Sequence, residues 1–164
     1  KFFIIKFYMK KISKLFFLIL LFNSSVFAET RNKYIMEQTN EEKRAKYVLS
    51  KMQQDYIACY SFYKISAEYV RKSNASIDII EGIEKSSDTS LKLAYDTGEM
   101  MSMARDEMSS MVKSEVRIQL ELIDNDFNNA SILLKKYAKT CKNLIEDKKK
   151  RISFWEKKAL DKFK

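Results

Sequence analysis

Residues 116–144 read VRIQLELIDNDFNNASILLKKYAKTCKNL, and the spacing of their apolar side chains decides the expected fold. Nine apolar residues recur at alternating steps of four and three: Val116, Leu120, Ile123, Phe127, Ala130, Leu134, Tyr137, Cys141 and Leu144. This spacing is typical of one continuous helix that packs an apolar seam against partner helices, whereas a half-buried strand would need a period of two. The seam mixes aromatic, small and sulfur-containing residues, which favours a bundle core over a leucine-zipper dimer.

Turn-forming residues are scarce throughout the chain. The 164 residues include no proline and two glycines, Gly82 and Gly98. Sandwiches, barrels and doubly wound sheets need many tight turns, which proline and glycine usually supply. The sequence therefore predicts an all-α protein. We expect an antiparallel bundle of two long helices, at about 40–72 and from about 103 to 147 or beyond, with two short helices between them.

Local signals set the expected helix boundaries. Thr39 followed by Glu42 is a capping box, in which each side chain satisfies a free backbone amide, and it predicts the start of the first long helix. Asn74 is the expected N-cap of the first short helix. Ser86-Ser87-Asp88 predicts a second break, because these side chains compete for backbone hydrogen bonds.

The N-terminal region has the pattern of a secretory signal peptide. Met9 is followed by Lys10, Lys11 and Lys14, then by the apolar run LFFLILLF at 15–22, and then by a small-residue site that ends at Ala28. The apolar run is shorter than the roughly 20 residues that a membrane-spanning helix needs. We therefore expect export and cleavage after Ala28. An uncleaved anchor or an interfacial helix is the alternative.

These signals divide the chain into four regions. They are a signal peptide with an upstream extension at 1–28, a flexible mature N-terminus at 29–38, a helical bundle domain at 39–147 and a basic amphipathic helical tail at 148–164.

The chain has two cysteines, Cys59 and Cys141, and each lies in the apolar stripe of its expected helix. In an exported protein an even number of cysteines favours a disulfide. Two buried free thiols are the alternative. If the two long helices run in opposite directions, a disulfide requires Cys59 and Cys141 to lie at the same height along them. Cys59 lies about 18 residues after the start of the first helix, so the last helix must continue about as far beyond Cys141, into the tail.

Charge is concentrated in the tail. Removing residues 1–28 leaves a net charge of +4, and residues 148–164 alone carry +6. A basic amphipathic helix with aromatic residues is suited to an anionic membrane surface or a protein partner. The candidate contact residues are Lys148, Lys149, Lys150, Arg151, Trp155, Lys157, Lys158 and Phe163. A solvated extension of the last helix, with its aromatic side chains docked on the first, is the alternative.

Several chemistries are excluded or disfavoured. The chain has no histidine, which excludes Ser-His-Asp and Cys-His catalysis and HExxH metal sites. We expect no catalytic residues, no cofactor and no metal. Asp124, Asp126 and Asn128 resemble half of a calcium loop, but Asn129 replaces its glycine and Lys135 its final glutamate. The seam through Phe127 requires a helix there instead.

The sequence therefore favours an exported, non-catalytic helical binding protein of the periplasm or cell exterior, with an unidentified protein partner. The first alternative is a peripheral membrane binder that acts through its tail; nucleic acid is not an expected partner. The second alternative is a small-ligand carrier or an enzyme that uses aromatic residues of the first long helix. Those residues are Tyr56, Tyr60, Phe62, Tyr63 and Tyr69.

Overall fold

The computed structural model describes the backbone of residues 2–164 and the side chains of residues 36, 37 and 39–164. The chain divides into two compact units, residues 1–42 and residues 43–164. The predicted signal peptide lies outside the residues whose side chains are described. Within the part of the chain that the structure describes, none of the helices has a stretch that is both long and apolar enough to cross a membrane.

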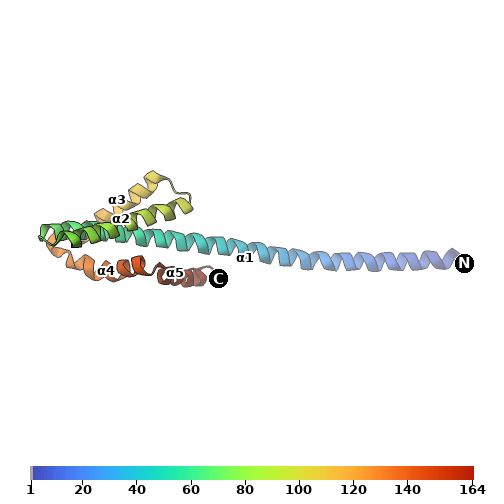
Figure 1. Ribbon diagram of the computed structural model, residues 1–164. Helices are drawn as coiled ribbons and strands as arrows, with labels where there is room; N and C mark the ends of the chain where they lie inside the picture. The colour runs from blue at the N-terminus through green and yellow to red at the C-terminus, as the bar shows by residue number, and fades with distance from the viewer. Residues whose placement is uncertain (1) are drawn as a thin grey trace. The chain divides into compact units, whose positions relative to one another are not determined.

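The described chain is all-helical, as predicted. The elements are α1 (Phe2–Lys72), α2 (Ile77–Met100), α3 (Arg105–Leu122), the 3-10 turn η1 (Phe127–Asn129), α4 (Ser131–Glu146) and α5 (Lys148–Lys162), with no strand in residues 2–164. Within residues 43–164, α2 and α3 lie on one side of α1, and α4 and α5 lie on the other side (Figure 1).

Contacts with α1 show the direction in which α4 and α5 run. Cys59 is bonded to Cys141, and the ring of Phe62 lies 6.2 Å from that of Tyr137. At the other end, the Arg44 guanidinium donates to the carbonyl of Phe163 at 2.7 Å. Partners later on α1 are therefore earlier on α4 and α5, so these two helices run antiparallel to this part of α1.

Small side chains let α2 pack closely on α1. The buried residues of α2 are Ser87, Ser90, Ala94, Thr97 and Gly98. A Cβ atom at Gly98 would overlap Met108 Sδ of α3 and Nε2 of Gln53 on α1. Buried Gln53 also donates from Nε2 to the carbonyl of Ala94 at 3.4 Å, so Gly98 is where three helices meet.

Several predicted boundaries are wrong. α1 passes through Thr39 without interruption, and it also covers 29–38, which was expected to be loose. The surrounding residues contain no proline or glycine, so nothing stops the helix at the capping box. At the other end α1 stops at Lys72, as predicted. Asn74 lies in the following turn with φ 55°, and the N-cap of α2 is Ser76.

The expected break at 86–88 is also wrong, because α2 is one helix where two short ones were predicted. The hydroxyl groups in this segment bond backwards within the helix. Ser86, Thr89 and Ser90 each donate to the carbonyl four residues earlier, at 2.8–2.9 Å. These hydroxyl groups therefore form their hydrogen bonds to the backbone within the helix and do not end it.

The predicted last long helix is divided into α3, η1, α4 and α5. Asp124 and Asn125 adopt positive φ values of 53° and 56°, and Asp126 accepts a hydrogen bond from the amide of Asn128. Asn and Asp tolerate this backbone conformation better than most residues, and their short side chains replace helical hydrogen bonds. The arrangement of two long and two short helices is therefore not found.

The apolar seam survives this interruption only in part. Ile123, Ala130, Cys141 and Leu144 are buried. Leu134, predicted to belong to the seam, is 46% exposed, and its neighbour Leu133 is 1% exposed. The turn at 123–130 therefore changes which face of the following helix meets the core.

Cys59 and Cys141 are both buried and form the predicted disulfide between α1 and α4, with Cα atoms 5.3 Å apart. The bond joins residues 82 positions apart. Eleven buried side chains form the core around it: Met52, Tyr56, Ile57, Cys59, Phe62, Ile65, Ala94, Ile123, Leu133, Cys141 and Leu144.

The Cys59→Ala/Cys141→Ala variant should lose about 4 kcal/mol of unfolding free energy, because a long loop is no longer closed in the unfolded chain. Urea unfolding followed by circular dichroism measures this loss. Reductant should lower the midpoint of the native protein and leave that of the variant unchanged. Equal midpoints for the oxidised protein and the variant would contradict the prediction.

The two glycines of α2 provide a matched pair. Nothing lies within 4 Å of a Cβ atom at Gly82. Gly82→Ala should therefore stabilise the protein by about 0.5–1 kcal/mol through helix propensity. Gly98→Ala should destabilise it by about 1–3 kcal/mol, because Met108 and Gln53 must move. Thermal unfolding of both variants measures the difference, and a stabilising Gly98→Ala would contradict the close packing.

Candidate functional site

Asp55 of α1 anchors α5. One carboxylate oxygen accepts from Nε of Arg151 at 2.7 Å and from the indole Nε1 of Trp155 at 2.6 Å, and the other accepts from a second guanidinium nitrogen at 2.8 Å. The Asp55 side chain is 15% exposed and that of Arg151 is 27% exposed. A two-pronged, half-buried ion pair of this kind fixes orientation as well as adding energy.

Aromatic side chains extend this anchor towards the chain end. The Tyr47 ring of α1 meets the rings of Trp155 and Phe163 edge to face, with centroids 6.2 and 5.8 Å away. Ala159 is buried between these positions, and Ile152 packs against the core. One face of α5 is therefore committed to α1.

The opposite face of α5 carries exposed charge. Lys150 and Lys157 project from this side, because a step of seven residues returns a helix almost to the same direction. Trp155 and Lys157 are two residues apart, which places them on nearly opposite sides of the helix. Two apolar side chains are exposed on opposite flanks of this face, Phe154 at 43% and Leu160 at 52%, and Leu160 also lines a groove between α5 and α1.

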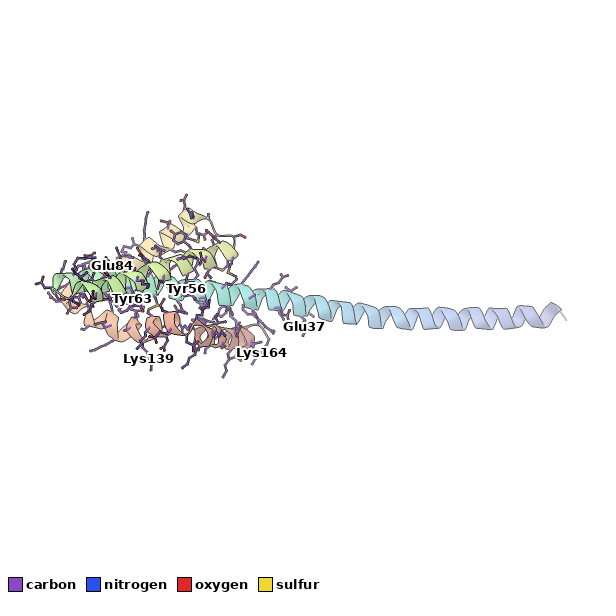
Figure 2. All side chains as sticks on the ribbon, in the orientation of Figure 1. Glu37, Tyr56, Tyr63, Glu84, Lys139 and Lys164 are labelled. Carbon is purple, nitrogen blue, oxygen red and sulfur yellow. A yellow bond between two sulfur atoms is a disulfide. The ribbon has the colours of Figure 1, made fainter. Side chains whose placement is uncertain are left out.

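The lysine surface continues along α4. Lys139 lies on the side of α4 that faces away from α1 (Figure 2). We define the lysine face as the exposed lysines of residues 131–164 other than Lys162, which lies over the Tyr47 ring of α1. They are Lys135, Lys136, Lys139, Lys142, Lys148, Lys149, Lys150, Lys157, Lys158 and Lys164.

The two helix pairs carry charge of opposite sign. Residues 131–164 contain twelve basic and four acidic side chains, a net charge of +8. Residues 76–122, which hold α2 and α3, contain five basic and ten acidic side chains, a net charge of −5. Because the pairs lie on different sides of α1, the charge of the second unit is polarised, and its positive pole is the lysine face.

The structure separates the predicted contact residues into two groups. Lys148, Lys149, Lys150, Lys157 and Lys158 are exposed. Arg151, Trp155 and Phe163 contact α1 through the interactions described above, and Phe163 also accepts from Arg44 through its carbonyl. The sequence left docking of the aromatic side chains on the first helix as an alternative, and Trp155 and Phe163 are docked there. It missed Asp55 as the anchor and missed Phe154 and Leu160 as the exposed apolar residues.

The tyrosines of α1 have a different setting. Tyr56 is buried in the core and Tyr63 packs against it (Figure 2). Burial, and then the nearby Asp55 carboxylate, raise the pKa of Tyr56 above its usual value; burial, and then Glu146, raise the pKa of Tyr63. Burial disfavours the charged phenolate at both positions, as expected for tyrosines packed in or against a core.

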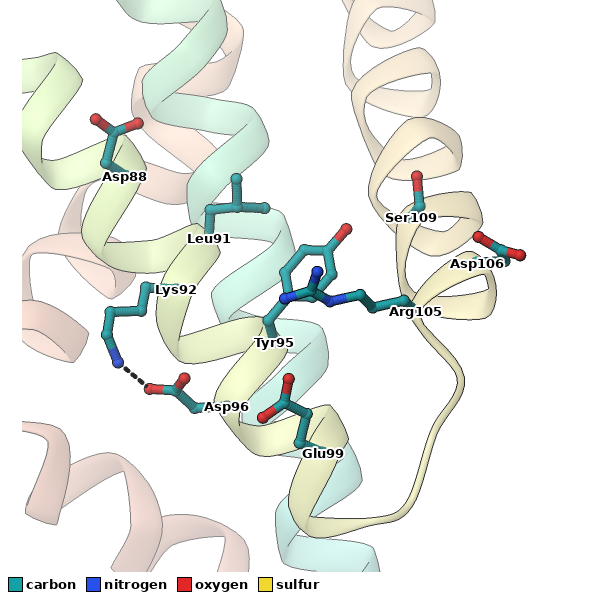
Figure 3. A pocket seen from close by; sticks show the side chains of 9 residues that line it. All are labelled: Asp88, Leu91, Lys92, Tyr95, Asp96, Glu99, Arg105, Asp106 and Ser109. Carbon is teal, nitrogen blue, oxygen red and sulfur yellow. Dashed lines mark hydrogen bonds and ion pairs between the residues drawn. The ribbon is translucent and has the colours of Figure 1, made fainter.

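An open groove of about 700 Å³ lies between α2 and α3. Figure 3 shows Arg105 reaching from α3 towards Tyr95 and Glu99 of α2. Asp96, at the groove edge, pairs with Lys92 at 2.6 Å. The groove is shallow and its charged side chains are of both signs, as on an ordinary helix surface.

The segment that resembled a calcium loop forms the turn before η1. Asp126 uses its carboxylate to accept from the amide of Asn128, and the Asn129 amide donates to the carbonyl of Ile123 at 3.3 Å. The expectation of a continuous helix through Phe127 was wrong. Among the described side chains, no group of three or more Asp, Glu, Cys or His residues is placed to hold a metal ion.

No match was found when the chain was compared with protein-family models, with curated proteins and with solved structures. A site can therefore be assigned only from the contacts and charges of this chain.

Asp55→Ala should release α5, because Arg151 and Trp155 lose their shared acceptor, and should cost about 2–4 kcal/mol. Hydrogen exchange should show faster exchange of α5 amides, with α2 amides less affected. Asp96→Ala removes an exposed ion pair and should change stability by about 0.5 kcal/mol or less. Equal losses in the two variants would argue against Asp55 as the anchor.

Proposed function

We propose that this chain is an exported, non-catalytic helical binding protein that engages an anionic partner through the lysine face. The proposal includes a signal peptide at 1–28 with cleavage after Ala28, followed by the mature regions at 29–38, 39–147 and 148–164. The disulfide supports an oxidising compartment such as the periplasm or cell exterior, because such bonds persist there.

The observation that carries the proposal is the division of α5 into two faces. Asp55 and Tyr47 hold one face against α1, so the lysines of the other face are presented on a fixed helix. Cations held in place lose less conformational freedom on binding than cations on a loose tail. Their number exceeds that of nearby carboxylates, so they favour a negatively charged partner.

The two alternatives left by the sequence have unequal support. A carrier or enzyme centred on the α1 tyrosines gains none, because Tyr56 and Tyr63 serve the core. A membrane partner retains support, but not with Trp155 and Phe163 as the inserted residues, because both contact Tyr47 in the folded protein.

Binding to a heparin column tests the proposal with a generic polyanion. The oxidised protein should bind at low salt and elute as salt rises. Lys157→Glu/Lys158→Glu should weaken the affinity at least about tenfold, because each reversal near an anionic surface costs on the order of 1–2 kcal/mol.

Lys85→Glu/Lys113→Glu is the matched control, because it makes the same change in net charge on exposed positions of α2 and α3. It should change the affinity by less than about twofold. Equal effects of the two variants would mean that net charge, and not the lysine face, governs binding. No retention of the native protein at low salt would end the proposal.

A further inference from the structure

We infer that the partner of the lysine face is an anionic lipid bilayer, and that α5 binds it while still docked on α1. This inference depends on the proposed function and specifies its partner. It also assigns the membrane contacts to Phe154 and Leu160, in place of Trp155 and Phe163.

The side-chain composition of the outward face supports a lipid surface. Phe154 is exposed on one flank of the row that contains Lys150 and Lys157, and Leu160 is exposed on the other flank, at the edge of a groove between α5 and α1. Lysine stems are long enough for their charged groups to stay at the lipid phosphates while shorter apolar side chains enter the interface. A soluble polyanion would bind the lysines but would make no use of the two exposed apolar side chains.

The extent of the charge supports a surface over a small ligand. The exposed lysines run along two successive helices, α4 and α5, that follow the same side of α1. A helix of 31 residues would be about 46 Å long, and the two helices together have that many residues. Charges spread over such a length can each contact a separate headgroup, whereas a small anion could use only a few.

The anchor determines how α5 meets the bilayer. Trp155 donates to Asp55 at 2.6 Å and its ring packs on Tyr47. Releasing α5 to insert Trp155 would leave Asp55 without both of its partners, next to the core. Binding of the docked helix avoids that loss, and it keeps Trp155 on the side of α5 opposite Lys157.

Vesicle binding tests the inference. The oxidised full chain is mixed at low salt with vesicles of phosphatidylglycerol and phosphatidylcholine in about equal parts, or of phosphatidylcholine alone. Co-sedimentation should occur with the anionic vesicles only and should fall as salt rises. Phe154→Ala/Leu160→Ala should weaken it at least about threefold, whereas Ile118→Ala/Leu122→Ala, an exposed apolar pair on α3, should not.

The fluorescence of Trp155, the single tryptophan of the chain, shows whether α5 stays docked. Lipids brominated on their acyl chains should quench it weakly in the bound state. A tryptophan added by Leu160→Trp should be quenched strongly. Strong quenching of Trp155 in the native chain would overturn docked binding.

The two proposals fail in different ways. A protein that binds heparin but not anionic vesicles at low salt overturns the lipid inference, leaves the proposed function in place and points to an acidic protein partner. A protein that binds neither loses both. Equal binding to the two kinds of vesicle would also overturn the inference, because the lysines would then have no part in it.

Discussion

The covalent link between α1 and α4 is the constraint on which the rest of the second unit depends. Cys59 and Cys141 lie in the middle of the core, with Phe62 meeting Tyr137 nearby and Leu144 buried further along. The link fixes how far α4 is displaced along α1. Because α5 follows α4 after the single residue Asp147, the position of α4 along α1 also brings Arg151 opposite Asp55.

The position of α4 along α1 therefore orients the basic amphipathic helix α5 that follows it. An isolated helix with the composition of α5 could present its aromatic residues or its lysines to a partner. Pairing with Asp55 and Tyr47 selects the lysines. The strength of the anchor therefore comes from a carboxylate on another helix, about 100 residues earlier in the chain.

The sequence predicted the helical class, the end of α1 at Lys72 and the cysteine pair, because each depends on a strong and simple signal. It failed where two local preferences compete. Ser86 could break a helix or bond back to Gly82, and the structure shows the second. A seam of regular spacing ran across Asp124 and Asn125, whose backbone preferences end the helix despite that spacing.

The sequence predicted the composition of the candidate site but left its orientation as two alternatives. The lysines of the tail were identified from sequence, and they are exposed. Which aromatic residues would accompany them depends on the rotation of α5 about its axis, and that rotation is set by Asp55. Nothing in the neighbourhood of Asp55 in the sequence marks it as a partner of Trp155, since the pair is brought together only by tertiary packing.

The position of the disulfide has one more consequence. The closed covalent loop ends at Cys141, so α5 lies outside it and contributes a single buried residue, Ala159, to the interior. Substitutions on the outward side of this 15-residue helix leave the loop and its core unchanged. The outward side of α5 can therefore acquire new binding preferences by substitution without destabilising the fold.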